Sequence, residues 1–231
     1  MKKIDSFIQS NIATVKARIA QALQQSGREQ DSVAIVAVTK RHSVHVIQAV
    51  VEAGIVDIGE SYVQEALQKQ AEYNDPRIRW HFIGQVQSNK CQLIAEHFSW
   101  VHSVSSVKVA MALSRARSAR QDPLNICVQI NLMNEPQKSG ITQEGLEELL
   151  HCVMSQPTLH LRGLMCIPPR LISREQLCEY FESMLQLKAI YSKQGLEMDV
   201  LSMGMSQDYE LAVQFGSTIV RIGEGIVGRR N

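Results

Sequence analysis

The first apolar pattern in the chain is that of an amphipathic helix. Over residues 4–26, large aliphatic side chains recur at spacings of three and four, which places them on one face of a helix. These positions are Ile4, Ile8, Ile12, Val15, Ile19 and Leu23. Gly27 follows them, where a glycine commonly ends a helix. The pattern predicts one long helix ahead of the rest of the fold.

A different pattern follows, in which apolar residues are continuous rather than periodic. Residues 33–38 read VAIVAV and lack the polar alternation of a strand that faces water on one side. Such a run is typical of a strand in a parallel sheet that is covered on both faces. Ser43 then precedes a helical pattern as its N-cap, and Gly54 ends that pattern.

The alternation of strand and helix continues along the sequence. Further strands are predicted over residues 56–59, 79–83, 100–104, 126–131, 161–167, 199–202 and 218–222. Helical patterns lie between them, over residues 61–74, 87–96, 107–119, 143–155, 174–194 and 209–214. Ser61 and Gln64 have the spacing of a capping box at the beginning of the first of these helices. No helix is expected after the last strand.

Counting residues 33–38 as the first, the sequence predicts eight strands, each except the last followed by a helix. Eight βα units with short connections predict an α/β fold, a closed (β/α)8 TIM barrel with residues 4–26 as an extra N-terminal helix. A count of six or seven strands would instead favour an open doubly wound sheet. No repeat, low-complexity tract or Pro/Gly-rich linker divides the chain, so residues 1–231 are expected to form a single domain.

Composition and charge restrict the classes of partner. The 231 residues are 45% hydrophobic and carry 24 Lys and Arg against 23 Asp and Glu, a formal net charge of +1. This balance supplies no field that would attract nucleic acid or an anionic membrane. Five cysteines occur without a C-x-x-C pair, which indicates a reducing compartment. Because no signal peptide and no apolar run near the ~18 residues of a membrane span are recognised, the expected location is cytoplasmic.

Two glycine-bearing segments follow the seventh and eighth predicted strands, where barrels of this kind often hold a phosphate. SMGMSQD contains Gly204 and Ser206 just before a short helix, and it offers backbone N–H groups and a hydroxyl to an anion. RIGEGIVG contains Gly223 and Gly225, which permit close approach of the backbone. The alternative interpretation is that these glycines serve only tight turns.

Two cations are candidates for the mouth of the barrel. Lys40 lies just past the first strand with the parity of Val36 and Val38. If that parity faces the interior, a partly desolvated Lys40 could form a Schiff base with a carbonyl compound, whereas the alternative is a solvated charge at a strand end. Arg221 interrupts the otherwise apolar TIVRI and needs a partner once buried, either in a structural ion pair or in a ligand.

Other polar residues give weaker signals. His81, in WHFIG, is equally consistent with support of a site and with capping, and the same holds for Asn89 and Lys90 in QSNK. Lys138, in KSG, follows the fifth strand and fits a mobile loop better than a ligand contact. Met203 fits packing better than function. The histidines have no metal-ligand spacing with cysteines or carboxylates, so no metal is expected.

Several segments, in order along nearly the whole chain, closely resemble the pyridoxal phosphate homeostasis protein family. They are AVTK at 37–40, GESYVQEA at 59–66, HFIGQVQSNK at 81–90, KSGI at 138–141, RGLM at 162–165, SMGMSQDYELAV at 202–213 and VRIGEGIVG at 220–228. The resemblance implies a barrel like the N-terminal domain of alanine racemase, of PLP-binding fold type III. It also implies that pyridoxal 5'-phosphate is bound as a Schiff base to Lys40.

The resemblance assigns roles to further residues of this sequence. It places Arg221 opposite the pyridine nitrogen and makes both glycine-bearing segments phosphate loops. The phosphate contacts that it implies are Ser206, Gly223 and Glu224, the last through its backbone N–H. The expected cofactor-binding set also contains Ser61, His81, Met203 and Gly204.

Two departures from the family pattern affect the expected site. The family usually reads GEN where this chain has Gly59, Glu60 and Ser61, so a hydroxyl replaces a side-chain amide near the cofactor. Glu224 stands where a small hydroxyl residue is common, and its carboxylate would repel a phosphate unless the side chain points outward. Weaker phosphate affinity than is typical of the family is therefore expected.

The family is regarded as non-catalytic, a carrier or reservoir that keeps free pyridoxal phosphate low and influences vitamin B6 and amino-acid pools. The implied partners are the cofactor itself and PLP-dependent apo-enzymes as candidate recipients, and a monomer or weak dimer is expected. The alternatives are a PLP-dependent racemase-like enzyme and a phosphate-ligand barrel enzyme in which Lys40 is a general base. In alanine racemases the second acid comes from a C-terminal domain of the partner subunit, and this sequence ends at Asn231, so efficient racemisation is not expected.

Overall fold

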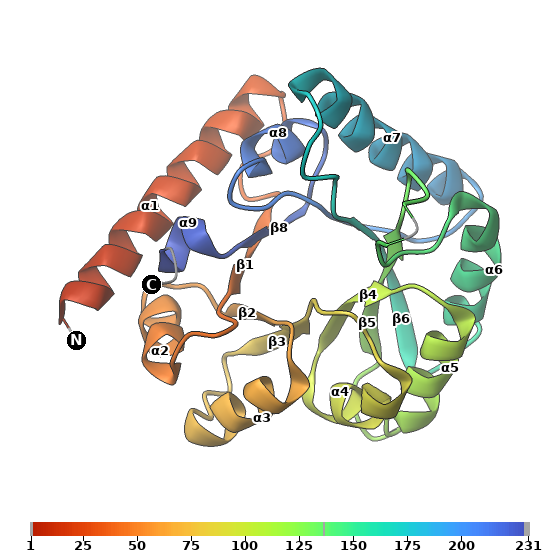
Figure 1. Cartoon of the computed structure of the whole chain (residues 1–231), viewed down its shortest axis with the longest axis horizontal. Helices are drawn as coiled ribbons and strands as arrows, with labels where there is room; N and C mark the ends of the chain where they lie inside the picture. The colour runs from red at the N-terminus through yellow and green to blue at the C-terminus, as the bar shows by residue number, and fades with distance from the viewer. Residues whose placement is uncertain (1, 136, 229–231) are drawn as a thin grey trace. The chain divides into compact units, whose positions relative to one another are not determined.

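The computed structural model describes residues 2–135 and 137–228, and in them eight strands form one closed barrel in chain order (Figure 1). The strands are β1 (Ala34–Val38), β2 (Asp57–Glu60), β3 (Arg79–Phe82), β4 (Trp100–Val104), β5 (Leu124–Ile130), β6 (Leu159–Cys166), β7 (Val200–Ser202) and β8 (Ile219–Ile222). The pairs β1–β2, β1–β8, β4–β5, β5–β6 and β6–β7 are parallel. The predicted α/β barrel is confirmed.

The chain divides into two compact units, one formed by residues up to His81 together with those from Met203 onward, the other by Phe82–Ser202. The helices of the first unit are α1 (Lys2–Gln25), α2 (Val44–Glu52), α3 (Val63–Glu72), α8 (Tyr209–Gln214) and α9 (Glu224–Val227). Those of the second are the 3-10 turn η1 (Ser88–Lys90), α4 (Cys91–His97), α5 (Val107–Ala116), α6 (Gln143–Met154) and α7 (Arg174–Lys193).

In the first unit, α1 packs against α2, α8 and α9 (Figure 1). The predicted apolar stripe is buried from Ile8 to Leu23, whereas Ile4 is exposed. The Asn11 side-chain amide donates to the Ile226 carbonyl oxygen at 2.9 Å, and Arg28 donates to the Val213 carbonyl oxygen at 2.6 Å. Polar contacts therefore join the middle of α1, and the segment just after it, to segments late in the sequence.

The two faces of β1 and β8 are occupied differently. Ala37 and Val220 belong to the apolar cluster that includes the buried residues of α1 and α2. Val36 is aligned with Arg221 in the β1–β8 register, and adjacent residues of a strand point to opposite faces. Val36 and Arg221 therefore face away from the helices, toward the barrel interior.

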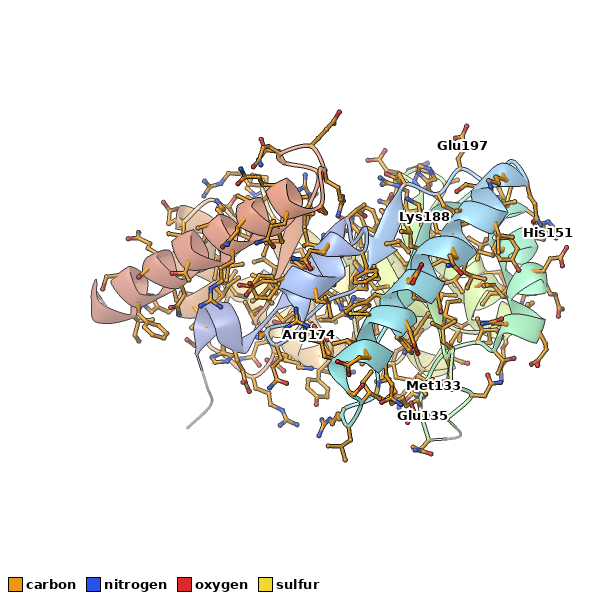
Figure 2. The ribbon with its side chains drawn as sticks, turned by 90° about the horizontal axis from the view of Figure 1, so that it is seen from above. Met133, Glu135, His151, Arg174, Lys188 and Glu197 are labelled. Atoms are coloured by element: carbon orange, nitrogen blue, oxygen red, sulfur yellow. The ribbon has the colours of Figure 1, made fainter. Side chains whose placement is uncertain are left out.

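The second unit has its own core and well-defined helix ends. The rings of Phe82 and Phe98 make an edge-to-face contact with centroids 5.3 Å apart. Ser173 and Gln176 form a capping box at the beginning of α7, which buries Phe181 among other residues. Figure 2 shows the charged Arg174 and Lys188 lying toward opposite ends of this helix.

Several local predictions were wrong at element ends. Ser61 does not begin a capping box: β2 extends to Glu60, the turn uses Ser61, and Tyr62 is the N-cap of α3 without a side-chain hydrogen bond. The prediction of Ser43 as the N-cap of α2 is confirmed, although its side chain makes no capping hydrogen bond. A short helix, α9, follows β8, because the Gly223 carbonyl oxygen accepts from the N–H groups of Ile226 and Val227. Four residues are too few to show a helical period.

Within the described residues, no helix has the length and apolar character needed to cross a membrane. No group of three or more His, Cys, Asp and Glu side chains in this part of the chain is arranged to hold a metal ion. All five cysteines are free thiols.

Gly163 allows β6 and β7 to approach each other, which yields a stability prediction. Its φ is +154°, and a Cβ added there would lie 1.9 Å from the Val200 carbonyl oxygen. Gly163→Ala should lower the free energy of unfolding by about 3 kcal/mol, the upper range for overpacking. Gly195→Ala is the matched control, since φ is +89° but nothing lies within 4 Å of the added Cβ; it should cost about 1 kcal/mol. Urea denaturation measures both, and equal losses would contradict the argument from close approach.

Candidate functional site

All nine predicted site residues belong to the first unit, and most of them follow the C-terminal ends of its strands or of β7. Lys40 comes two residues after β1 and Ser61 directly after β2. The remaining residues past a strand end are Met203, Gly204 and Ser206 after β7, and Gly223 and Glu224 after β8. Arg221 and His81 lie within β8 and β3.

The direction of Lys40 follows from its neighbour. The Thr39 N–H donates to the Gly59 carbonyl oxygen at 3.2 Å, so the pairing of β1 with β2 continues past Val38. The fully buried Thr39 hydroxyl donates to Glu60 Oε1 at 2.7 Å. Alternation of side chains along β1 gives Lys40 the parity of Val38 and Val36, which is the parity that faces the barrel interior. This agrees with the interior-facing interpretation of the sequence.

The turn that follows Lys40 is held in an uncommon conformation. Arg41 has φ = +63°, a left-handed backbone conformation that costs a residue other than glycine about 1 kcal/mol or more. The Arg41 N–H donates to Glu65, and its guanidinium donates to the Tyr62 hydroxyl at 3.1 Å. The His42 N–H donates to the Thr39 carbonyl oxygen at 3.0 Å and closes the turn.

Hydrogen bonds join the segment after β7 to β8 and to the segment that follows β8. The Gly225 N–H donates to Ser206 Oγ at 3.1 Å, and the Arg221 N–H donates to the Gly204 carbonyl oxygen at 3.0 Å. The two glycine-bearing segments are therefore neighbours, as a shared anion site requires. Glu224 is exposed, so its side chain points to solvent.

Gly204 and Gly223 differ in whether the surrounding packing requires a glycine. Gly204 has φ = +96°, and an added Cβ would lie 2.7 Å from Ala212 Cβ, so the packing of α8 alone demands glycine there. A Cβ at Gly223 would lie at an ordinary 3.6 Å from Val38 Cβ, with φ at −100°. Nothing in the chain's own packing requires glycine at 223.

Arg221 is buried, with 4% of its surface exposed, as its position within an apolar strand predicts. Burial raises the pKa of Asp208, and the positive charge of Arg221 opposes that increase. Asp208 also accepts a hydrogen bond from the Met205 N–H at 2.5 Å. The Asp208 carboxylate thus orders the segment before α8. It also lies close enough to Arg221 for the positive charge of the guanidinium to affect its pKa.

His81 contacts Asp57, which lies at the beginning of β2, away from the strand end that Ser61 follows. Its Nε2 lies 2.9 Å from Asp57 Oδ1, and Arg79 binds both oxygens of Asp57 at 2.6 Å. Burial lowers the pKa of His81, with the Asp57 carboxylate opposing the shift. Burial alone would raise the pKa of Asp57, but hydrogen bonds from Arg79 and His81 hold it well below its usual range.

Met203 is fully buried, and its carbonyl oxygen accepts from Ser217 Oγ at 2.7 Å. This placement agrees with packing as the main role of its side chain. The structure therefore groups Lys40, Ser206, Gly223 and Glu224 at strand ends, with Arg221 below them in the barrel wall, and gives His81 and Met203 structural partners.

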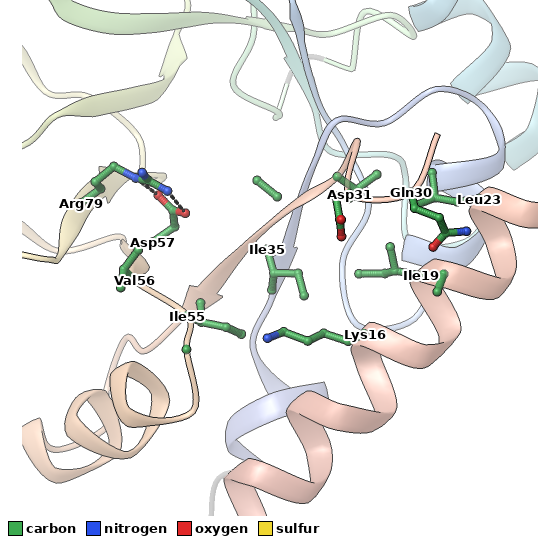
Figure 3. Close-up of a pocket in the computed structure, with 14 residues that line it drawn as sticks. Lys16, Ile19, Leu23, Gln30, Asp31, Ile35, Ile55, Val56, Asp57 and Arg79 are labelled. Atoms are coloured by element: carbon green, nitrogen blue, oxygen red, sulfur yellow. Dashed lines mark hydrogen bonds and ion pairs between the residues drawn. The ribbon is translucent and has the colours of Figure 1, made fainter. Parts of the chain in front are cut away.

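A pocket of about 530 Å³ lies at the other end of the strands, between α1 and the beginnings of β1, β2 and β3. Figure 3 shows Lys16 of α1 extending across it toward Ile55, and the Asp57–Arg79 ion pair beside it. This pocket includes none of the predicted site residues. The charges of Asp57 and Arg79 satisfy each other.

Comparison with known proteins agrees with the barrel fold. Residues 10–231 match the alanine racemase N-terminal domain family, so the chain is a barrel of that class. A pyridoxal phosphate homeostasis protein of Pseudomonas aeruginosa is 45% identical over 226 residues, which cover 98% of this chain and 97% of that protein. The chain belongs to the pyridoxal phosphate homeostasis protein family.

Solved structures extend the comparison. PipY of Synechococcus elongatus, in its structure with PLP bound, is 34% identical with a TM-score of 0.81, covering 91% of this chain and 100% of that chain. An alanine racemase from Corynebacterium glutamicum is 16% identical with a TM-score of 0.68, covering 96% of this chain and 60% of that chain. The second likeness shows the fold alone.

The His81–Asp57 contact predicts a dependence of stability on pH. Because the folded state lowers the pKa of His81, the unfolded chain takes up this proton first as pH falls below about 6.5. Stability is therefore greatest above that pH and is lost in acid, by at most about 1.4 kcal/mol per pH unit from this residue. His81→Gln should flatten the decline between pH 6.5 and 5, whereas the exposed His151→Gln should not. The free energy of unfolding is measured by urea denaturation at each pH. If it falls equally with pH in wild type and His81→Gln, the assignment is refuted.

Proposed function

We propose that this protein binds pyridoxal 5'-phosphate covalently through Lys40 and serves as a non-catalytic carrier or buffer in vitamin B6 and amino-acid homeostasis. The observation that carries the proposal is the parity of Lys40: Thr39 is committed to Glu60 on the helix side, and Lys40 follows Val38, which lies 3.6 Å from the position of a Cβ at Gly223. The family supports it, as does the PipY structure with PLP bound.

We assign the phosphate to the segments after β7 and β8. The Ser206 hydroxyl and the backbone of Gly223 and Glu224 would hold it, and the packing around Gly223 would accept a Cβ, so a bound phosphate is the reason that we propose for glycine there. Since the Glu224 side chain is exposed, its carboxylate is screened by solvent and repels the phosphate less than a buried one would. Ser61, at the end of β2, is a further contact, with a shorter reach than an amide. Gly204 acts through the packing of α8.

Arg221 is assigned to the pyridine nitrogen. Pyridoxal phosphate supplies an electron-withdrawing ring, and that effect is strongest when the ring nitrogen is protonated. A permanently charged, buried guanidinium disfavours a second positive charge beside it. Arg221 thereby restrains chemistry on bound amino acids, which suits a carrier and argues against the racemase alternative. His81 contacts Asp57, and we propose that it supports the site without touching the cofactor.

PLP-dependent apo-enzymes are the recipients that we propose for the carried cofactor. A cytoplasmic location agrees with the free state of all five cysteines, which a reducing compartment preserves. A monomer or weak dimer is the expected form.

Replacement of Lys40 tests the covalent assignment. After incubation with pyridoxal phosphate and reduction with borohydride, peptide mass analysis of wild type should find the cofactor on Lys40, and Lys40→Ala should lose that label completely. Lys90→Ala is the control and should keep the label on Lys40. A reducible adduct that persists at the wild-type level in Lys40→Ala would place the cofactor on another lysine and end this assignment.

Replacement of Arg221 tests the restraint on chemistry. Arg221→Glu, and the milder Arg221→Gln, should speed exchange of the amino-acid α-proton with solvent on the order of tenfold for each pKa unit gained by the ring nitrogen. NMR follows the exchange at matched cofactor occupancy, with circular dichroism to check the fold. Equal rates in wild type and both variants would reduce Arg221 to a structural charge. Efficient conversion of any L-amino acid to its D form by wild type would overturn the non-catalytic role.

A further inference from the structure

A buried cluster of charges surrounds the backbone that carries Lys40, and none of the roles assigned above uses it. Lys69 Nζ, from α3, donates to Glu60 Oε1 at 2.7 Å, to Glu65 Oε1 at 2.6 Å and to the Thr39 carbonyl oxygen at 2.8 Å. All three donor hydrogens of the ammonium are therefore engaged. One of its three acceptors is the carbonyl group directly before Lys40.

This cluster adds little net stability to the fold, because burial of its charges is unfavourable. Lys69 is 5% exposed and Glu60 is 0% exposed, so both charges have left water. Glu60 Oε1 accepts from Lys69 and from Thr39, whereas Oε2 has no hydrogen-bond partner among the described residues. Buried ion pairs are weak sources of stability, because desolvation offsets their attraction, and an unsatisfied oxygen increases that cost. The cluster therefore calls for a role besides stability.

Its contacts converge on the two residues that flank Lys40. Lys69 holds the Thr39 carbonyl oxygen on one side, and Glu65 accepts from the Arg41 N–H on the other. Arg41 has the positive φ of +63°, a conformation that persists only where the surroundings impose it. Glu65 and Lys69 also form an i, i+4 ion pair on α3. One face of that helix therefore holds the backbone on both sides of Lys40.

We propose that Lys69, with Glu60 and Glu65, positions Lys40 for its covalent bond with the aldehyde of pyridoxal phosphate, an inference that rests on the function proposed above. In that step the neutral Lys40 amine gives its electron pair to the aldehyde carbon. A C=N bond replaces the C=O bond, and the oxygen leaves as water with both amine hydrogens. The three residues act through the backbone of Thr39 and Arg41, so they are positioning residues that do not touch the cofactor.

The test compares two probes that differ only at the reacting group. One is pyridoxal 5'-phosphate, and the other is its 4'-deoxy analogue, in which a methyl group replaces the aldehyde and no covalent bond can form. The main variant is Lys69→Met combined with Glu60→Gln, which removes the ammonium and neutralises the carboxylate that it would otherwise leave unpaired. Glu65→Ala is the second variant, and its partly exposed side chain makes it the milder change.

Both variants should bind pyridoxal phosphate about tenfold or more weakly, the effect of one lost charge-assisted hydrogen bond, and bind the 4'-deoxy analogue within about twofold of wild type. The matched control is Glu72→Gln, on the same helix, where the exposed Glu72 accepts from Gln68; it should leave both affinities unchanged. Thermal melting monitors the fold of each variant.

Two outcomes would overturn the inference in different ways. An equal loss of both probes, or no loss of either, in folded variants means that the cluster only maintains the fold, and it leaves the proposed function intact. Equal binding of the two probes by wild type means that no covalent bond forms, and it overturns the proposed function together with this inference.

Discussion

Side-chain alternation along the barrel strands is the constraint from which the arrangement of the candidate site follows. In β1 and β8 one parity is committed to the apolar layer under the helices, which contains Ala37 and Val220. The other parity is left for the interior, where Val36 and Arg221 are aligned. Lys40 inherits the interior direction because Thr39, with the opposite parity, is bound to Glu60. A shift of one residue in β1 would exchange these two environments.

Alternation also explains how much of this site the sequence could predict. Lys40 has the parity of Val36 and Val38 in the sequence, but VAIVAV is apolar on both faces, so which parity faces the barrel interior stayed open until the contacts of Thr39 and Ala37 were known. Arg221 could be placed inside because it interrupts an apolar strand. The segments with Gly204 and Gly223 were located by their places after the seventh and eighth strands. In each case the signal lies within a few residues of the group that it describes.

The missed features depend on pairs that are far apart in sequence or on very short elements. The contact between Lys69 and the Thr39 carbonyl oxygen joins residues separated by 30 positions, and a lysine in an amphipathic helix does not indicate its partner. Its one signal was its spacing from the buried Val63 and Ala66, which places it on the apolar face of α3. The capping box predicted at Ser61 was wrong because the sequence does not determine the residue at which β2 ends. The engagement of His81 with Asp57 joins two strands, which local sequence does not reveal.

The packing of α1 against α8 and α9 has a consequence for the order of folding. The contact between Asn11 and the Ile226 carbonyl oxygen spans 215 positions, and that between Arg28 and the Val213 carbonyl oxygen spans 185. At the usual pace of about 5–20 residues per second, synthesis of the intervening chain takes on the order of 10–40 seconds. Throughout that interval the apolar stripe of α1 lacks its late partners. The nascent chain therefore carries an amphipathic helix with an uncovered apolar face, and an element early in this sequence is among the last to reach its native contacts.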